Sequence, residues 1–208
     1  MASEIDRVMQ RAWRYWYEDG LAELAGGILF LFVGLVLALE ALLPHLARIT
    51  AFALPVVVLV GLVLARWALG AAKRRFVFPR TGYVSYRRVG RRRRLLTAIV
   101  GGAMAAGFSS LIATAPAARS WIPALQGLVV GLAWLWLGHS IGLLRCYVLG
   151  ALSAGCGLLL AFSGLGEIAG SALYFSVQGL AMAGSGGAAL HAYLRQSHNA
   201  AGEGDHGH

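Results

Sequence analysis

Four polar side chains near the C-terminal end of the chain share one helical face. Glu167, Ser171, Tyr174 and Gln178 follow i, i+4, i+7 and i+11 spacing, which places them in one line along a helix. A carboxylate, two hydroxyls and an amide can hold a small polar molecule through hydrogen bonds. Because polar groups avoid lipid, we expect this line, called the polar stripe below, to face other helices.

Further polar residues are expected at the same depth in the membrane, and a small cavity open to the outside could form among them. These residues are Ser109, Ser110, Gln126 and Ser163. The simpler alternative is that the stripe only joins helices through hydrogen bonds, worth about 0.6 kcal/mol each on average. We favour this alternative. Glu167 lies close enough to the membrane surface to be solvated.

No catalytic set accompanies the polar stripe in the sequence. The chain has no Gly-rich phosphate loop, no zinc-ligand pair at a known spacing, and no Ser, His and acid set on converging segments. Cys146 and Cys156 lie ten residues apart, about 15 Å along one helix, which is too far for a disulfide. The acids and histidines of residues 203–208 fit a solvated tail. The sequence therefore predicts no enzyme, no cofactor and no metal site.

The composition predicts an integral membrane protein. Hydrophobic residues make up 58% of the chain and charged residues only 13%, against roughly 25% charged residues in soluble domains. Hydropathy divides the chain into six apolar segments of about the 20 residues that a membrane helix needs. They are Leu21–Leu43, Ile49–Leu69, Leu95–Ala115, Trp121–Leu144, Cys146–Leu165 and Glu167–Leu190. Short links predict three consecutive hairpins in an all-α, polytopic membrane helix bundle.

Basic residues orient this predicted bundle. Ten of the eighteen Lys and Arg residues lie in residues 72–94, and sixteen of the eighteen fall on the side of the N-terminus. The positive-inside rule then places both termini in the cytoplasm. The first apolar segment is too long for a cleavable signal and is expected to remain in the mature protein.

The basic loop also suggests a partner. A net charge of +9 suits nucleic acid, but the bases lie in one loop between apolar segments, so we expect anionic phospholipid and no nucleic acid. Each base contributes about 1 kcal/mol of attraction to an anionic surface. The bases concerned are Arg87, Arg88, Arg91, Arg92, Arg93 and Arg94. Residues 76–86 can form a short β-hairpin, which is either structural or a docking site for a cytoplasmic protein.

The N-terminal segment, residues 1–20, is expected to be an amphipathic helix lying in the membrane interface. Its apolar residues recur at helical spacing and include Trp13 and Trp16, which suit the headgroup region. A surface anchor is the favoured interpretation and a partner-binding helix the alternative. The acids Glu18, Asp19 and Glu23 follow, and we expect at least one of them to pair with Arg80, Arg87 or Arg88 of the basic loop.

Two short motifs, YWYEDGLAEL from Tyr15 and PRTGYV from Pro79, resemble those of a family of small, uncharacterised bacterial inner-membrane proteins. The resemblance implies a bacterial source and the inner membrane, and it implies no activity.

Small residues at i, i+4 spacing are common in residues 95–190, so we expect close packing among the last four segments, within one molecule rather than between two. The first two segments, residues 21–71, are expected to face lipid more, and residues 191–208 to form a disordered cytoplasmic tail.

The function predicted is that of a membrane-embedded interaction or sensory protein with a cytoplasmic docking surface. The alternative is a transporter or channel that uses the polar stripe. The sequence leaves the ligand, the partner and the oligomeric state open.

Overall fold

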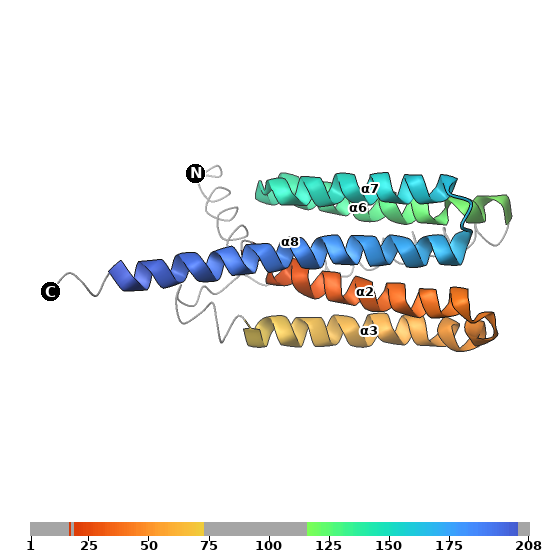
Figure 1. Ribbon diagram of the computed structural model, residues 1–208, viewed down its shortest axis with the longest axis horizontal. Coiled ribbons are helices and arrows are strands. Elements are labelled where there is room, and N and C mark those ends of the chain that lie inside the picture. Colours follow the sequence, from red (N-terminus) through yellow and green to blue (C-terminus); the bar gives the residue numbers. More distant parts are fainter. Residues whose placement is uncertain (1–16, 18, 73–115, 204–208) are drawn as a thin grey trace, which may run out of the picture.

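The computed structural model describes residue 17 and residues 19–72 and 116–203 of the chain. Every regular element in these ranges is a helix, as Figure 1 shows. The elements are α2 (Leu21–Leu42), the 3₁₀ turn η1 (Pro44–Leu46), α3 (Ala47–Ala72), the 3₁₀ turn η3 (Pro116–Trp121), α6 (Ile122–Ile141), α7 (Leu144–Phe162) and α8 (Glu167–Glu203). The predicted all-helical class is confirmed.

Four of the described helices are long and apolar enough to cross a membrane, namely α2, α3, α6 and α7. They coincide with four of the six predicted segments, so the chain is a membrane-embedded protein. The predicted segment Leu95–Ala115 lies outside the described residues. Helix α8 is not among the four, because its Gly and Ser residues, Tyr174 and Gln178 lower its mean hydropathy.

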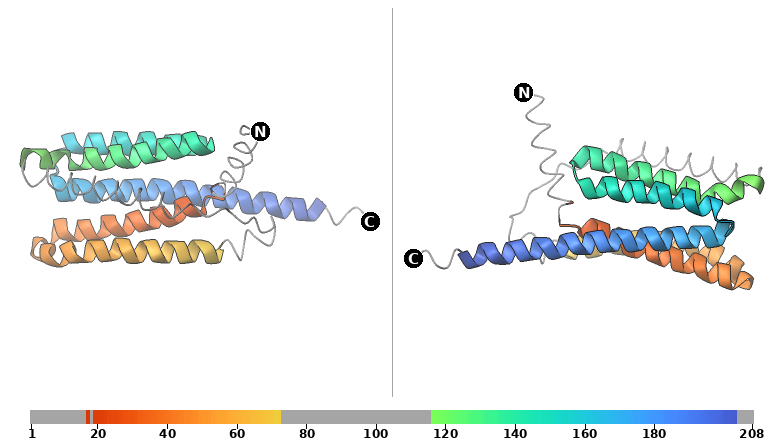
Figure 2. Two further views of the ribbon diagram at one scale, coloured as in Figure 1. Left: turned by 180° about the vertical axis from the view of Figure 1, so that it is seen from behind. Right: turned by 45° about the horizontal axis from the view of Figure 1, so that its top comes forward.

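Helix α8 lies in the middle of the bundle, with α2 and α3 on one side and α6 and α7 on the other (Figure 1). Its C-terminal part extends beyond the ends of the other helices, as both views in Figure 2 show. The helix continues past Leu190, the predicted end of the apolar segment, to Glu203, so residues 191–203 of the segment expected to be a disordered tail are helical. Residues 191–203 are too polar for the membrane, but they include Ala, Leu, Arg and Gln, which favour helix in water as well.

Glycines bring α2 and α8 into close contact. A Cβ atom added at Gly27 would lie 2.5 Å from the backbone nitrogen of Ala183, and one added at Gly186 would lie 2.5 Å from that of Leu24. Helices in lipid gain most of their contact energy from such close backbone approach. The expectation that the first two segments face lipid more than the others is confirmed for α3, which is 6% buried and lies at the edge of the bundle (Figure 1). It is wrong for α2, which is as buried as α7.

A second glycine-lined contact joins α6 to α7. A Cβ atom at Gly157 would lie 2.4 Å from the carbonyl oxygen of Pro123, and one at Gly131 would lie 2.9 Å from that of Gly150. Helices α7 and α8 follow each other across a short link, but the closest packing of α8 is with α2 and that of α7 is with α6. Which helices pack most tightly therefore cannot be predicted from their order in the sequence alone.

Candidate functional site

The polar stripe faces the inside of the bundle. Tyr174 and Gln178 have no exposed surface, and Ser171 is 4% exposed. The Tyr174 hydroxyl has two acceptors for its one proton, Ser153 Oγ on α7 at 2.7 Å and the carbonyl oxygen of Gln126 on α6 at 3.3 Å. Ser153 Oγ in turn donates to the Gly127 carbonyl at 3.0 Å. The middle of the stripe thus joins α8 to α6 and α7 through hydrogen bonds.

Gln178, the last residue of the stripe, is fully buried in the middle of the bundle. Its Nε2 donates to the Leu149 carbonyl at 3.4 Å, and no exposed surface remains on the residue. A path for water or solute along the stripe would have to pass this side chain. The stripe is therefore packed at Tyr174 and Gln178 and not lined by solvent.

The other predicted cavity residues are divided between several places. Gln126, Glu167 and Ser171 line a partly open cavity of about 520 Å³ at the end of the bundle where α8 begins. Ser163 is exposed and donates to the Leu160 carbonyl at 2.7 Å, so it takes no part in this cavity. Ser109 and Ser110 lie outside the described residues.

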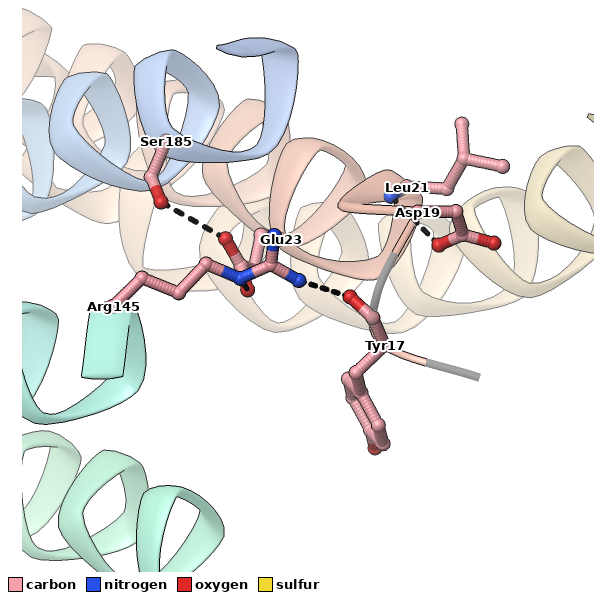
Figure 3. A network of polar contacts seen from close by, with 6 residues as sticks. All are labelled: Tyr17, Asp19, Leu21, Glu23, Arg145 and Ser185. Atoms are coloured by element: carbon pink, nitrogen blue, oxygen red, sulfur yellow. Dashed lines mark hydrogen bonds and ion pairs between the residues drawn. The ribbon is translucent and has the colours of Figure 1, made fainter. Parts of the chain in front are cut away.

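A second polar site, which the sequence analysis did not recognise, lies at the opposite end of the bundle (Figure 3). Glu23 of α2 is 1% exposed, and its Oε1 lies 2.7 Å from Nε of Arg145, the second residue of α7. Ser185 Oγ on α8 donates to the other carboxylate oxygen at 3.0 Å. Arg145 also donates through a terminal nitrogen to the Tyr17 carbonyl. We call Glu23, Arg145, Ser185 and the Tyr17 carbonyl the Glu23 cluster.

The chain just before α2 is held in place beside the Glu23 cluster. Asp19 is 1% exposed, and its Oδ1 accepts a hydrogen bond from the Leu21 backbone N–H at 3.1 Å. Gly20 has a φ of +70°, and a Cβ atom there would lie 2.4 Å from the Gly186 carbonyl oxygen. Only glycine combines this left-handed conformation with so close an approach. Burial raises the pKa of Tyr17, and nearby Cys146 raises it further, so the phenol stays neutral.

The Glu23 cluster joins three helices that are far apart in the sequence, α2, α7 and α8. The Glu23 carboxylate is almost fully removed from water, while the Arg145 side chain is still 23% exposed. A buried charge is tolerated only when it is paired and further hydrogen-bonded. Removing one partner of a buried pair costs about 3–5 kcal/mol, because the other charge is left buried. The cluster therefore fixes the first turns of α2 and α7 against the middle of α8.

The partner of Glu23 is Arg145 on α7. The expected pairing of the acids Glu18, Asp19 and Glu23 with Arg80, Arg87 or Arg88 stays a prediction. Glu18, Arg80, Arg87 and Arg88 lie outside the described residues, as do Trp13, Trp16 and Arg91, Arg92, Arg93 and Arg94. A signal for the pair did exist: both residues were predicted near the same end of the bundle, and both are costly in lipid unless paired.

Metal binding finds no support in the described part of the chain, where no three His, Cys, Asp or Glu side chains come together. Comparison with protein-family models, with curated proteins and with solved structures finds no match. The function must therefore be inferred from the geometry of this chain.

Proposed function

We propose that this protein is a bacterial inner-membrane interaction protein, with six membrane crossings and both termini in the cytoplasm. Its N-terminal segment, its basic loop and the projecting end of α8 together form a docking surface for a cytoplasmic protein. Anionic phospholipid holds the basic loop close to the membrane.

The observation that carries this proposal is the Glu23 cluster. It lies at the end of the bundle where α2 begins, α3 ends and the C-terminal part of α8 projects (Figures 1 and 2). The Arg145 side chain contacts both Glu23 and the Tyr17 carbonyl, so the exit of the N-terminal segment is fixed to α7. A docking surface made of separate segments needs such a rigid base.

The closed polar stripe supports interaction over transport. A transporter needs polar groups that solute or ions can reach near the middle of the membrane. Tyr174 and Gln178 are fully buried and bonded to neighbouring helices. Their role is therefore to hold α8 against α6 and α7.

The test is co-purification from bacterial membranes in mild detergent, with mass spectrometry of both proteins and lipids. The variant carries Arg94→Gln, and the control carries Arg48→Gln, which removes the same charge from the opposite end. A protein that is retained by the wild type and the control but lost from the variant is then purified and mixed with the wild type. Direct binding supports the proposal. Loss of lipid alone would make the loop an anchor and refute the docking role.

A further inference from the structure

A groove at the end of the bundle opposite the Glu23 cluster has the shape and polarity of a lipid site. It lies between α2, α3, α6 and α8 and has a volume of about 520 Å³. Ten of its thirteen lining residues are aliphatic or aromatic, among them Phe30, Val33, Val58 and Phe175. The volume falls within the roughly 300–1,000 Å³ of typical ligand pockets.

The polar lining residues are confined to one end of this groove. Glu167 is the first residue of α8, and Ser171 lies one turn later. Gln126 lies about one turn into α6. In contrast, Val58 lies about 16 Å along α3 from the start of that helix, toward the middle of the membrane. The groove is therefore polar near the membrane surface and apolar below it, which matches a lipid with its head at the surface.

The polar end offers hydrogen-bond acceptors. The Gln126 Oε1 atom is buried and accepts no hydrogen bond from any residue that the structure describes. Among the described residues, Glu167 pairs with Arg119, and the distance from Arg119 Nε to Glu167 Oε2 is 4.0 Å. Both of these side chains are partly exposed, so the pair is weak. A buried acceptor without a donor and a loosely paired carboxylate both favour a ligand head that is cationic and donates hydrogen bonds.

We propose that the groove binds a phospholipid with a primary ammonium head, such as phosphatidylethanolamine, with one hydrocarbon chain between α2, α3 and α8. The ammonium group donates hydrogen bonds to Glu167 and to Gln126 Oε1, and Arg119 faces the lipid phosphate. This site is independent of the cytoplasmic docking surface, because it lies at the other end of the bundle.

The test measures which lipids remain bound to the purified protein by native mass spectrometry. Mixed micelles contain equal amounts of phosphatidylethanolamine and phosphatidylcholine with the same acyl chains. The two heads carry the same charge, but the quaternary ammonium of choline has no N–H to donate. A charge-assisted hydrogen bond predicts a preference of about tenfold for phosphatidylethanolamine.

Two variants with matched controls examine the two ends of the groove. Glu167→Gln is expected to abolish the preference, while Glu40→Gln, a carboxyl group on α2 that does not line the groove, retains it. Val58→Phe fills the apolar end and is expected to reduce retention of both lipids, while Val63→Phe, which is 67% exposed and outside the groove, leaves retention unchanged.

Equal retention of the two lipids by the wild type would overturn the proposal, and so would an unchanged preference in Glu167→Gln. Retention unaffected by Val58→Phe would mean that another occupant, such as the predicted segment Leu95–Ala115, fills the groove. Should Val58→Phe fail to fold, the pair of glutamate variants decides the question, because Glu167 is partly exposed and its amide is of equal size.

Discussion

Arg145→Ala is expected to be one of the most destabilising single substitutions in the described part of the chain. Arg145 Nε lies 2.7 Å from Glu23 Oε1, and the Glu23 side chain is 1% exposed. Without Arg145 the carboxylate keeps, among the described residues, its hydrogen bond from Ser185. Breaking a buried pair in this way costs about 3–5 kcal/mol, or roughly two to three and a half orders of magnitude in the unfolding equilibrium.

The assay is thermal unfolding in detergent followed by labelling of thiols with a maleimide. Cys146 follows Arg145 in the chain and has no exposed surface, so it reports when the start of α7 separates from the bundle. In Arg145→Ala, labelling of Cys146 is expected at a much lower temperature than in wild type. Cys156 is replaced by Ala in all variants, so that only one thiol is present.

Two controls separate the ion pair from a general effect of losing an arginine. Arg48→Ala removes an exposed arginine and is expected to change the midpoint little. The double variant Glu23→Leu with Arg145→Met replaces the pair by apolar side chains of similar size, and it is expected to recover most of the lost stability. If Arg145→Ala is no worse than Arg48→Ala, or if the double variant is as unstable as the single one, then the pair does not hold the three helices together.

Three further predictions follow from the helix contacts and the proposed topology. Gly186→Leu is expected to push α2 away from α8 and to destabilise the bundle by about 1–3 kcal/mol or more, whereas Gly184→Leu is expected to be tolerated, because a Cβ atom there meets nothing within 4 Å. Thermal unfolding of the two variants tests this difference, and equal midpoints would contradict it. Tyr174→Phe is expected to lower the free energy of unfolding by only about 0.6 kcal/mol per lost hydrogen bond. Liposomes that contain this variant are expected to retain dye as well as liposomes that contain the wild type, and a new leak of dye would argue for a path along the polar stripe. Alkaline phosphatase fused after Leu165 is expected to be active and the same enzyme fused after His208 inactive, because the proposed orientation puts the former outside and the latter inside. Activity at both sites would contradict that orientation.

The candidate sites differ in how far the sequence could predict them. The spacing of Glu167 to Gln178 places these residues on one face, and the cost of polar groups in lipid turns that face inward. Both arguments are local, so they need no knowledge of the fold. The partners of the stripe are different, because Ser153 Oγ and the Gln126 carbonyl come from helices whose rotation about their own axes the sequence does not give.

The Glu23 cluster shows the same limit more sharply. Glu23 and Arg145 are separated by more than a hundred residues, and several basic residues of residues 72–94 were equally good partners by depth and charge. The packing of α7 beside α2 and α8 decides that Arg145, rather than another basic residue at this end of the bundle, lies next to Glu23. The left-handed Gly20 and its contact with Gly186 depend on that packing as well.

The sequence by itself determined that this is a helical membrane protein, because hydropathy and charge are sums over short stretches of chain. It also determined that the polar stripe avoids lipid. Only the tertiary structure decided that α8 lies in the middle of the bundle against α2, because many small residues at similar spacing allow several helix pairings of nearly equal energy. The selection among them comes from contacts between distant segments, such as the hydrogen bond from Ser185 on α8 to Glu23 on α2.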